Sequence, residues 1–534
     1  MAMKRSPNLL SSFLLDTAAV RGDQIALRDG LRELNYARIV LLASAIARDL
    51  QQAGIGRGDR VVLLMSNSIG FCVTFWGIVL AGAVAVPLSP DTKKEKFAWI
   101  VGNCEPKAVV MDELLLPMVQ AAIAQTSLPP YLLMYVGTGL LGQDLIVFDE
   151  DTAAAEATPV ARPLADIIDR DLAAIIYTSG STGDPKGVML THLNITSAAR
   201  SVSTYLGYRS DDVVFCAIPL SFDYGLHQLT MATLVGATLY VEVSFAQPFF
   251  ALSHLVSCGA TVFPIVPTMV PLIEPLVDRF EVGRVRCLTS TSAALHSGSI
   301  DKLAAMFCHA TIFSMYGLTE CHRCTYLDPA ELETRKMSVG KAIPNTELWL
   351  VDKEGRRHFR NATGELVIRG STVMKGYWNN PAKTAEKLRM CPETQEVVLF
   401  TGDTCRLDED GFLYFIARDD DILKVGGQKV APSEIERMLT SHPVVSQAAA
   451  IGETHPTHGE RPVAFVTLHP GQDAKPRALL DWCRERLEHH VVPARIIIVD
   501  ELRRNQNGKI DRHVLRDLLV NTLDHPIAAE ETPS

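Results

Sequence analysis

Short apolar runs alternate with longer mixed segments through the first part of the chain. The runs at 59–65, 83–88 and 172–176 are almost continuously hydrophobic and too short for helices, so they predict buried strands. The segments at 35–47 and 70–81, which precede the runs at 59–65 and 83–88, predict helices. Buried strands that alternate with helices are typical of a parallel sheet with helices on both faces. The pattern therefore predicts an α/β fold with a doubly wound sheet.

The pattern changes beyond Asn361, where short β segments such as 364–370 and 411–416 are separated by turn residues. A chain of 534 residues is too long for one compact core, which indicates two or more domains. We expect residues 420–534 to form a separate small α+β domain.

Composition narrows the class of protein. With 47% hydrophobic and 21% charged residues, the chain is expected to be a soluble globular protein. A net charge of −10 without a dense basic tract argues against nucleic acid or an anionic membrane as the main partner. No apolar run is long enough to span a membrane. Eleven scattered cysteines show no disulfide pattern and favour a reduced, cytoplasmic location.

A loop of small polar residues follows the run at 172–176. Its glycine and hydroxyl residues leave backbone N–H groups exposed, which suits a phosphate, and Lys186 adds a positive charge. The loop is not a Walker A motif, because Gly187 and Val188 follow the lysine. A linker is the alternative, but apolar segments flank both sides, and beyond Val188 we expect helix through His192, Asn194 and Ala198. The residues expected to bind the nucleotide phosphates are Thr178, Ser179, Gly180, Ser181, Thr182, Gly183 and Lys186.

Two further motifs combine glycine with a carboxylate at the end of an apolar segment. They are Tyr316-Gly-Leu-Thr-Glu320 and Thr401-Gly-Asp403. A carboxylate can accept two hydrogen bonds from a diol, and together with phosphate oxygens it can bind a hard cation. Each motif alone is also compatible with an ordinary turn, so its meaning depends on the other motifs.

The C-terminal part carries two more motifs. Residues 417–436 contain Arg418, three consecutive acidic residues and a Gly-Gly pair, and the Pro-Ser dipeptide at 432–433 predicts a helix start. Near the end of the chain, an Asn-Gly dipeptide predicts a tight turn with Lys509 at its tip.

In this order, the motifs and the segment at 80–90 resemble those of the adenylate-forming superfamily, which includes acyl-CoA synthetases, amino-acid adenylation enzymes and luciferases. The chain departs from the family pattern at Ala417, where relatives usually have glycine. The resemblance implies a large N-terminal domain of doubly wound sheets plus a distorted β-barrel over residues 1–419. It implies a small, mobile α+β C-terminal domain over residues 420–534.

The resemblance also implies a role for each matching residue. The implied catalytic residues are Lys509, Thr319 and Glu320, and Glu320 is also the implied Mg²⁺ ligand. Beyond the phosphate loop, the implied ATP-binding residues are Tyr316 on adenine, Gly317, Asp403 on the ribose, and Arg418. Asp420 is the implied hinge between the domains, and Gly426 and Gly427 are implied to line a tunnel for the thiol substrate.

These roles imply a reaction in two steps. A substrate carboxylate would attack the α-phosphate of ATP in the presence of Mg²⁺, Lys509 would neutralise charge, and pyrophosphate would leave. The pantetheine thiol of CoA or of a carrier protein would then take the acyl group from the acyl-adenylate, and AMP would leave. A luciferase-like oxygenase shares the motifs, whereas a catalytically silent binding protein would lack the equivalents of Lys509 and Glu320.

The segment Phe222-Asp223-Tyr224 bears on the choice of acid. It resembles a block in which amino-acid adenylation domains pair the aspartate with the substrate ammonium, and a buried carboxylate needs such a partner. Alternatively, Asp223 bonds to the backbone or to His227. Residues Thr291–Ala294 stand where relatives often have Gly-Gly or Gly-Ala, and the side chains of Thr291 and Ser292 fill room that glycine would leave, which argues against a long straight fatty chain. The residues expected at the acid are Phe222, Asp223, Tyr224, Ser292, Ala293 and Gly317, with Leu226, Cys321 and Cys324 completing the wall.

The first hypothesis is therefore an enzyme that loads an α- or β-amino acid onto a carrier protein, supplied in trans, in natural-product biosynthesis. The alternative is an acyl-CoA synthetase for a non-amino medium-chain, fatty or aryl acid. Two other patterns carry no function. Residues 137–142 fit GxGxxG but no helix signal follows, and the CxxC at 321–324 has no second pair to complete a zinc site.

Overall fold

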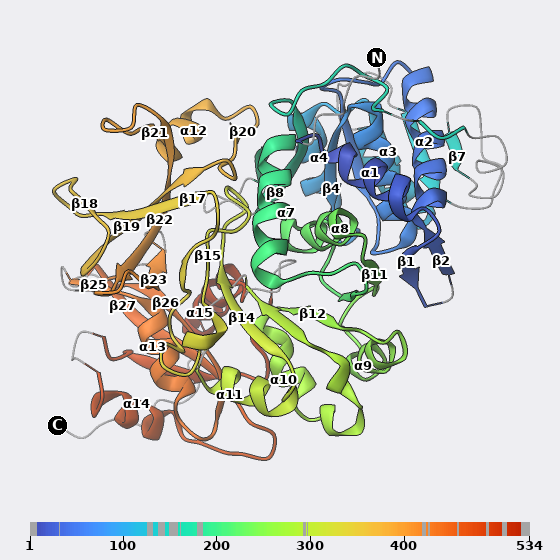
Figure 1. Cartoon of the computed structure of the whole chain (residues 1–534). Helices are drawn as coiled ribbons and strands as arrows, with labels where there is room; N and C mark the ends of the chain where they lie inside the picture. The colour runs from blue at the N-terminus through green and yellow to red at the C-terminus, as the bar shows by residue number, and fades with distance from the viewer. Residues whose placement is uncertain are drawn as a thin grey trace. The chain divides into compact units, whose positions relative to one another are not determined.

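The computed structural model describes the chain from residue 8 to residue 524 with internal gaps (Figure 1). The residues outside this description are 1–7, 31, 125–131, 137–144, 149–157, 161, 179–184, 292–294, 296, 419–422, 426–427, 456–458, 488–490, 505–509 and 525–534.

The chain divides into two compact units. Unit 1 contains Met1–Trp349 and Val367–Phe400, and unit 2 contains Leu350–Leu366 and Thr401–Ser534. The predicted boundary between residues 419 and 420 falls outside the described residues and stays a prediction. The helices of unit 1 are α1 Leu10–Arg21, α2 Tyr36–Gln52, α3 Ile69–Ala81, α4 Lys94–Cys104, α5 Leu116–Ile123, α7 His192–Leu206, α8 Asp223–Val235, α9 Pro248–Ser257, α10 Val270–Ile273, α11 Ser297–Met306 and α12 Pro381–Lys387.

The first sheet of unit 1 has eight strands in the order β20-β9-β8-β4-β3-β5-β6-β7. Most neighbours are parallel, as in the β3–β4, β3–β5 and β4–β8 pairs. Helices α4 and α5 cover one face, where Phe97 and Val119 pack against Val62, Val86 and Ile175. The strands are β3 Arg60–Leu64, β4 Val84–Leu88, β5 Ala108–Met111, β6 Leu132–Val136, β7 Leu145–Phe148, β8 Leu172–Thr178, β9 Lys186–Thr191 and β20 Gly376–Tyr377.

The second sheet has nine strands in the order β16-β15-β14-β13-β12-β10-β11-β1-β2. Its central strands are parallel. Helix α3 is buried along all of its 13 residues, as expected for a helix enclosed on every side, and it contacts β3 and β4 of the first sheet and β1 of the second. The strands are β1 Ile25–Asp29, β2 Arg32–Asn35, β10 Val213–Cys216, β11 Thr238–Val241, β12 Val262–Ile265, β13 Cys287–Ser290, β14 Thr311–Tyr316, β15 Thr325–Tyr326 and β16 Lys341–Ala342.

Two further sheets follow along the chain. One has the strand order β18-β17-β19-β22-β21 with β23 beside β22, and the chain changes unit within β17, β19 and β22. Its strands are β17 Thr346–Val351, β18 Arg357–His358, β19 Ala362–Gly370, β21 Leu388–Met390, β22 Val397–Leu407 and β23 Leu413–Arg418. The other sheet, in unit 2, has the order β25-β24-β27-β26 with β28 beside β27. Its strands are β24 Leu423–Val425, β25 Gln428–Val430, β26 Val445–His455, β27 Gly459–Leu468 and β28 Arg495–Ile498.

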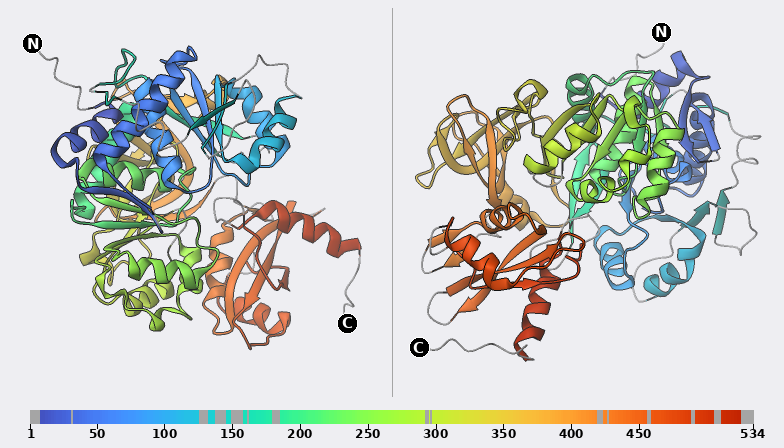
Figure 2. Two further views of the ribbon diagram at one scale, coloured as in Figure 1. Left: turned by 90° about the vertical axis from the view of Figure 1, so that its right-hand side faces the viewer. Right: turned by 90° about the horizontal axis from the view of Figure 1, so that it is seen from below.

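The sheet of unit 2 is covered on both faces (Figure 2). Helices α13 Pro432–Thr440 and α14 Pro476–Arg484 pack on the face that carries Ala450 and Val466. Helix α15 Arg512–Asp524 packs on the opposite face, which carries Ile451 and Phe465. Successive residues of each strand therefore point to opposite faces and pack into two small cores. This part is an α+β structure.

The predicted α/β class with a small C-terminal α+β domain is confirmed, and so are the early helices. Asn35 caps α2 by accepting a hydrogen bond from the Arg38 N–H, and Ser68 caps α3 in the same way. The helix expected beyond Val188 through His192, Asn194 and Ala198 is present as α7 His192–Leu206, but it does not start at Val188. Residues Lys186–Thr191 form β9, which pairs antiparallel with β8, and α7 begins only at His192. Among the described residues, no helix has the length and apolar character needed to cross a membrane.

Candidate active site

The predicted phosphate loop joins two paired strands. Thr178 at the end of β8 lies opposite Lys186 at the start of β9, and the Thr178 hydroxyl lies 3.5 Å from the Lys186 carbonyl oxygen. Gly187 leaves little room for a side chain, because a Cβ there would lie 2.8 Å from Cγ2 of Ile175. The hairpin therefore holds both ends of the loop side by side. The other predicted loop residues, Ser179, Gly180, Ser181, Thr182 and Gly183, lie outside the described residues.

Glu320 is attached to the same hairpin from a distant part of the sequence. Its carboxylate accepts a hydrogen bond of 2.7 Å from the Tyr377 hydroxyl, and its carbonyl oxygen accepts one from the Met374 N–H. Tyr377 belongs to β20, which pairs with β9 at Val188. The fold thus brings Glu320 and the phosphate loop together through a two-residue strand that the sequence motifs did not predict.

Close backbone packing fixes the conformation of the rest of the Tyr316–Glu320 motif. Tyr316 ends β14, and Thr319 lies in a half-buried turn beside Glu320. A Cβ on Gly317 would lie 2.4 Å from the His322 carbonyl oxygen, so only glycine lets the chain fold back here. His322 itself has φ of +56°, a conformation that costs free energy for a non-glycine residue.

The donor set fits a magnesium ion held mainly by the nucleotide. Glu320 offers one carboxylate, and no group of three or more His, Cys, Asp or Glu side chains could hold a metal within the described part of the chain. Mg²⁺ commonly takes one or two protein carboxylates and completes its shell with phosphate oxygens and water. The same result leaves Cys321 and Cys324, whose sulfur atoms lie 3.0 Å apart, without the further ligands of a zinc site.

In unit 2, strand pairing brings two predicted ribose-binding residues together. Asp403 of β22 lies opposite Arg418 of β23, and the Arg418 Nε lies 3.3 Å from the Asp403 carboxylate. The Asp403 side chain is 2% exposed, and its backbone N–H donates to the Thr401 hydroxyl. Asp420, Gly426, Gly427 and Lys509 lie outside the described residues, so their roles stay predictions.

The predicted acid-binding segment stands at the start of α8. Phe222 is the residue before the helix, and Asp223 and Tyr224 form its first turn. The Tyr224 hydroxyl lies 2.8 Å from the hydroxyl of Thr289 on β13, which anchors the ring. Leu226 and both cysteines of the predicted wall are buried, whereas Ser292 and Ala293 lie outside the described residues.

Arg323 is the residue of this region that sequence reasoning missed. Its Nη1 lies 3.3 Å from the Asp223 carboxylate, and its guanidinium carbon lies 4.6 Å from the centre of the Tyr224 ring. The Arg323 side chain is 3% exposed, against 17% for Asp223. Both nitrogens of His227 lack a hydrogen-bond partner among the described residues, so the suggested Asp223–His227 bond is not observed. The signal in the sequence that could have identified Arg323 is its position as a basic residue just after the Tyr316–Glu320 motif.

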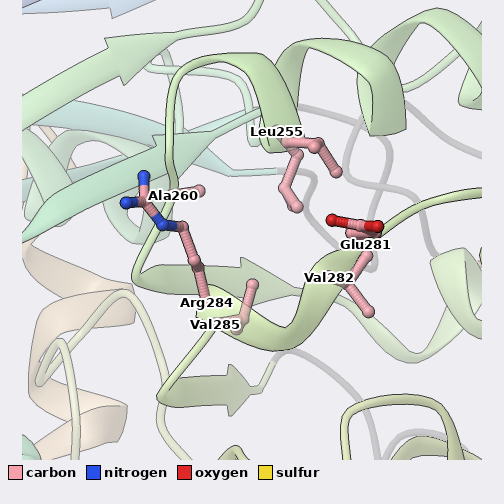
Figure 3. A pocket seen from close by; sticks show the side chains of 7 residues that line it. Leu255, Ala260, Glu281, Val282, Arg284 and Val285 are labelled. Atoms are coloured by element: carbon pink, nitrogen blue, oxygen red, sulfur yellow. The ribbon is translucent and has the colours of Figure 1, made fainter.

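A separate pocket of about 270 Å³ lies between α9 and the turn at Val282–Arg284 (Figure 3). The residues that line it are Leu255, Val256, Ala260, Glu281, Val282, Arg284 and Val285. None of the predicted site residues belongs to this set, so the pocket is not part of the candidate active site.

Comparison with known proteins gives the family. The AMP-binding enzyme family matches residues 14–378, and its C-terminal domain family matches residues 434–509. A 2-succinylbenzoate-CoA ligase from Geobacillus kaustophilus (strain HTA426) is 31% identical over 520 residues, which covers 96% of this chain and 99% of the relative. A 4-coumarate-CoA ligase from Pinus taeda is 30% identical over 537 residues, covering 96% and 95%.

Solved structures agree with this relationship. The anthranilate CoA ligase AuaEII in complex with anthranoyl-AMP superimposes with a TM-score of 0.87 at 27% identity, covering 96% of this chain and 98% of that one. ATP-bound MatB from Rhodopseudomonas palustris gives a TM-score of 0.84 at 28% identity, with the same coverage. The resemblance inferred from the motifs is confirmed. The chain belongs to the AMP-binding enzyme family, within the adenylate-forming superfamily, and is an AMP-forming acid–thiol ligase.

Proposed function

We propose that this enzyme is a CoA ligase for a non-amino carboxylic acid, with an aryl acid as the favoured class. The observation that carries the proposal is the position of Arg323. The hypothesis of an amino-bearing acid required a substrate ammonium to pair with the Asp223 carboxylate. Because Arg323 Nη1 lies 3.3 Å from that carboxylate, the protein itself supplies the cation.

The relatives support the same class. The two curated relatives are ligases of 2-succinylbenzoate and 4-coumarate, which are both aryl acids, and each matches nearly the whole chain. CoA is the thiol that both names specify. We therefore take CoA as the acceptor, ATP as the second substrate and the cytoplasm as the location.

In the first half-reaction, a carboxylate oxygen of the acid attacks the α-phosphorus of ATP, and the bond to pyrophosphate breaks. The hairpin of β8 and β9 would hold the departing phosphates, and the Tyr316 ring would lie on adenine. Asp403 would accept hydrogen bonds from the ribose hydroxyls. Mg²⁺, when bound beside Glu320, would neutralise negative charge on the phosphate oxygens. Positioning and electrostatic stabilisation carry most of the catalysis in reactions of this kind.

In the second half-reaction, the CoA sulfur attacks the acyl carbon, the carbon–oxygen bond to AMP breaks, and AMP leaves. We assign Lys509 to charge neutralisation in the first half only. Asp420 would be the hinge that lets residues 420–534 turn between the two halves relative to residues 1–419, and Gly426 and Gly427 would line the thiol tunnel. These assignments rest on the motif resemblance.

A panel of acids tests the proposal. ATP–pyrophosphate exchange would be measured with cinnamate, 4-coumarate, benzoate, octanoate, β-alanine and a mixture of α-amino acids, and the best acid would then be offered CoA or a phosphopantetheinyl carrier protein. We expect the aryl acids to support the fastest exchange and CoA to be acylated. Fastest exchange with an amino acid, followed by transfer to the carrier, would refute the proposal.

An amino-bearing acid remains the second candidate function, with one observation in its favour. The Asp223 side chain is more exposed than Arg323, so one side of the carboxylate is not enclosed by that ion pair. Anthranilate, the acid named for AuaEII, carries both an aromatic ring and an amino group. Adding anthranilate beside benzoate in the panel separates this candidate from the first.

A further inference from the structure

The Arg323 guanidinium is only partly used by the protein. Its Nη1 donates to the His322 carbonyl oxygen at 2.6 Å and lies near Asp223. Its Nε and Nη2 are buried and have no hydrogen-bond partner in the described part of the chain. These two nitrogens share one edge of the planar group and present two parallel N–H donors. That edge matches the two oxygens of a carboxylate.

Two buried histidines lie beside this arginine. The rings of His227 and His322 are stacked with centroids 5.5 Å apart, and all four ring nitrogens lack a hydrogen-bond partner among the described residues. Burial lowers the pKa of His322 to about 4 and holds the pKa of His227 well below its usual value. Both rings are therefore neutral near pH 7, and each has one N–H donor to offer.

Four buried hydroxyl residues stand near residues of this region along the chain or across a strand pair. Ser221 precedes Asp223 by two residues, Ser290 and Thr291 follow the Thr289 that bonds Tyr224, and Thr325 lies opposite Tyr316 in the β14–β15 pair. The hydroxyl oxygens that are buried and unpaired among the described residues here are those of Ser221, Ser290, Thr291 and Thr325. Native proteins pair most buried polar groups, so the unpaired nitrogens of Arg323, His227 and His322, which lie together, indicate a missing polar ligand.

We propose that this cluster, defined by Arg323, His227 and His322, binds a second carboxylate at the far end of the acid substrate. The preferred acids would then be dicarboxylic. The inference rests on the proposed function, because it takes Asp223 and Tyr224 to line the acid site. A hydrocarbon tail would leave the buried donors unpaired, and a site built to donate hydrogen bonds rejects such tails strongly. An ammonium tail would face the positive charge of Arg323.

Matched pairs of acids test the inference directly. Each pair differs only in a carboxylate that replaces a methyl group: glutarate and pentanoate, adipate and hexanoate, terephthalate and 4-methylbenzoate, 4-carboxycinnamate and 4-methylcinnamate. In ATP–pyrophosphate exchange with the full chain, we expect at least one dicarboxylate to exceed its methyl partner by about tenfold or more in kcat/KM. Methyl members that equal or exceed their partners in every pair would overturn the inference.

The variant Arg323→Gln tests the residue. We expect the preference for the dicarboxylate to fall below about threefold, with Arg323→Lys keeping part of it because a lysine offers donors without the paired geometry. Arg286→Gln is the matched control, because Arg286 is a partly buried arginine paired with Asp212 away from the cluster. It should lower stability and leave the preference intact. If Arg323→Gln lowers both members of a pair equally, Arg323 acts only in folding and the inference is wrong.

The outcomes separate the inference from the proposed function. Rapid exchange and CoA transfer with monocarboxylic aryl acids, with no gain from a second carboxylate, would leave the proposed function standing and remove the inference. Exchange confined to amino acids would remove both. His322→Gln provides a second variant, and a loss of dicarboxylate preference with an unchanged KM for ATP would support the inference even if Arg323→Gln does not fold.

Discussion

The predicted nucleotide side and the predicted acid side of unit 1 differ in how their principal polar side chains are paired. On the nucleotide side, the Glu320 carboxylate already accepts a hydrogen bond from Tyr377, and the ends of the phosphate loop are paired with each other. On the acid side, Arg323, His227 and His322 keep buried donors without a partner among the described residues. A preorganised site lowers the cost of reaction, whereas unpaired donors make binding depend on the right ligand. We infer that the first side serves a fixed chemistry and that the second serves the selection of the acid.

The largest expected effect is a loss of the first half-reaction alone. Lys509→Ala should lower the rate of acyl-adenylate formation by about 10³-fold, because a positive charge is lost where negative charge develops. Thioester formation from supplied acyl-adenylate should be largely spared. Rapid-quench measurement of both half-reactions gives the comparison, with the second half serving as the internal control. Equal loss in both halves would contradict the role given to Lys509.

A second pair of variants tests how the nucleotide side is preorganised. Glu320→Gln should lower kcat by about 10²-fold and raise the Mg²⁺ concentration needed for half-maximal rate, because a charged oxygen ligand is lost. Tyr377→Phe removes only a hydrogen bond to that carboxylate, so its effect should be about tenfold or less. Steady-state kinetics over a magnesium titration measures both. Similar losses in the two variants would mean that Glu320 acts through Tyr377 rather than at the metal.

A third comparison concerns the hairpin that carries the phosphate loop. Gly187→Ala places a methyl group 2.8 Å from Ile175 and 3.0 Å from the Tyr177 ring, so the free energy of unfolding should fall by about 1–3 kcal/mol. Gly102→Ala is the matched control in α4, where nothing lies within 4 Å, and it should gain up to about 1 kcal/mol. Urea denaturation measures both, and a neutral Gly187→Ala would show that the hairpin can relax.

The last comparison concerns two buried histidines, one directly after β9 and one beside Arg323. Burial lowers the pKa of both His192 and His322 to about 4, and nearby Asp171 and Asp169 oppose this for His192. Each ring is neutral when folded and takes up a proton when unfolded below its ordinary pKa of about 6.5. The stability each contributes is therefore complete above that pH and falls by up to about 3 kcal/mol as the pH drops to 4.

Substitutions at the two histidines should have the same effect on the pH dependence of stability but different effects on the choice of acid. His192 accepts a hydrogen bond from the Leu10 N–H, so His192→Asn can keep that bond, and it should flatten the acid slope without changing the choice of acid. His322→Gln should flatten the slope and also weaken the preference for a dicarboxylate. Urea denaturation between pH 4 and 7, with exchange assays alongside, measures both properties. A change of acid preference in His192→Asn would contradict the division between the two sides.

The sequence predicted the fold class and the early helices because local signals were strong. The apolar runs at 59–65 and 83–88 became the buried strands β3 and β4, and Asn35 and Ser68 cap the helices around them. The helix expected beyond Val188 begins only at His192, because β8 offers Lys186–Thr191 a hydrogen-bonding partner. That partner is a separate segment of the chain and has no signature within Lys186–Thr191 itself.

By itself, the sequence determined the family and the chemistry, because the phosphate loop and the Tyr316–Glu320 motif are contiguous stretches whose residue order carries their meaning. Only the tertiary structure decided what surrounds Asp223. Arg323 is 100 residues away in the chain, and it reaches Asp223 because Gly317 lets the backbone fold back at His322. A partly buried carboxylate such as that of Asp223 needs a partner. The identity of that partner depends on contacts between distant segments, which no local sequence pattern records.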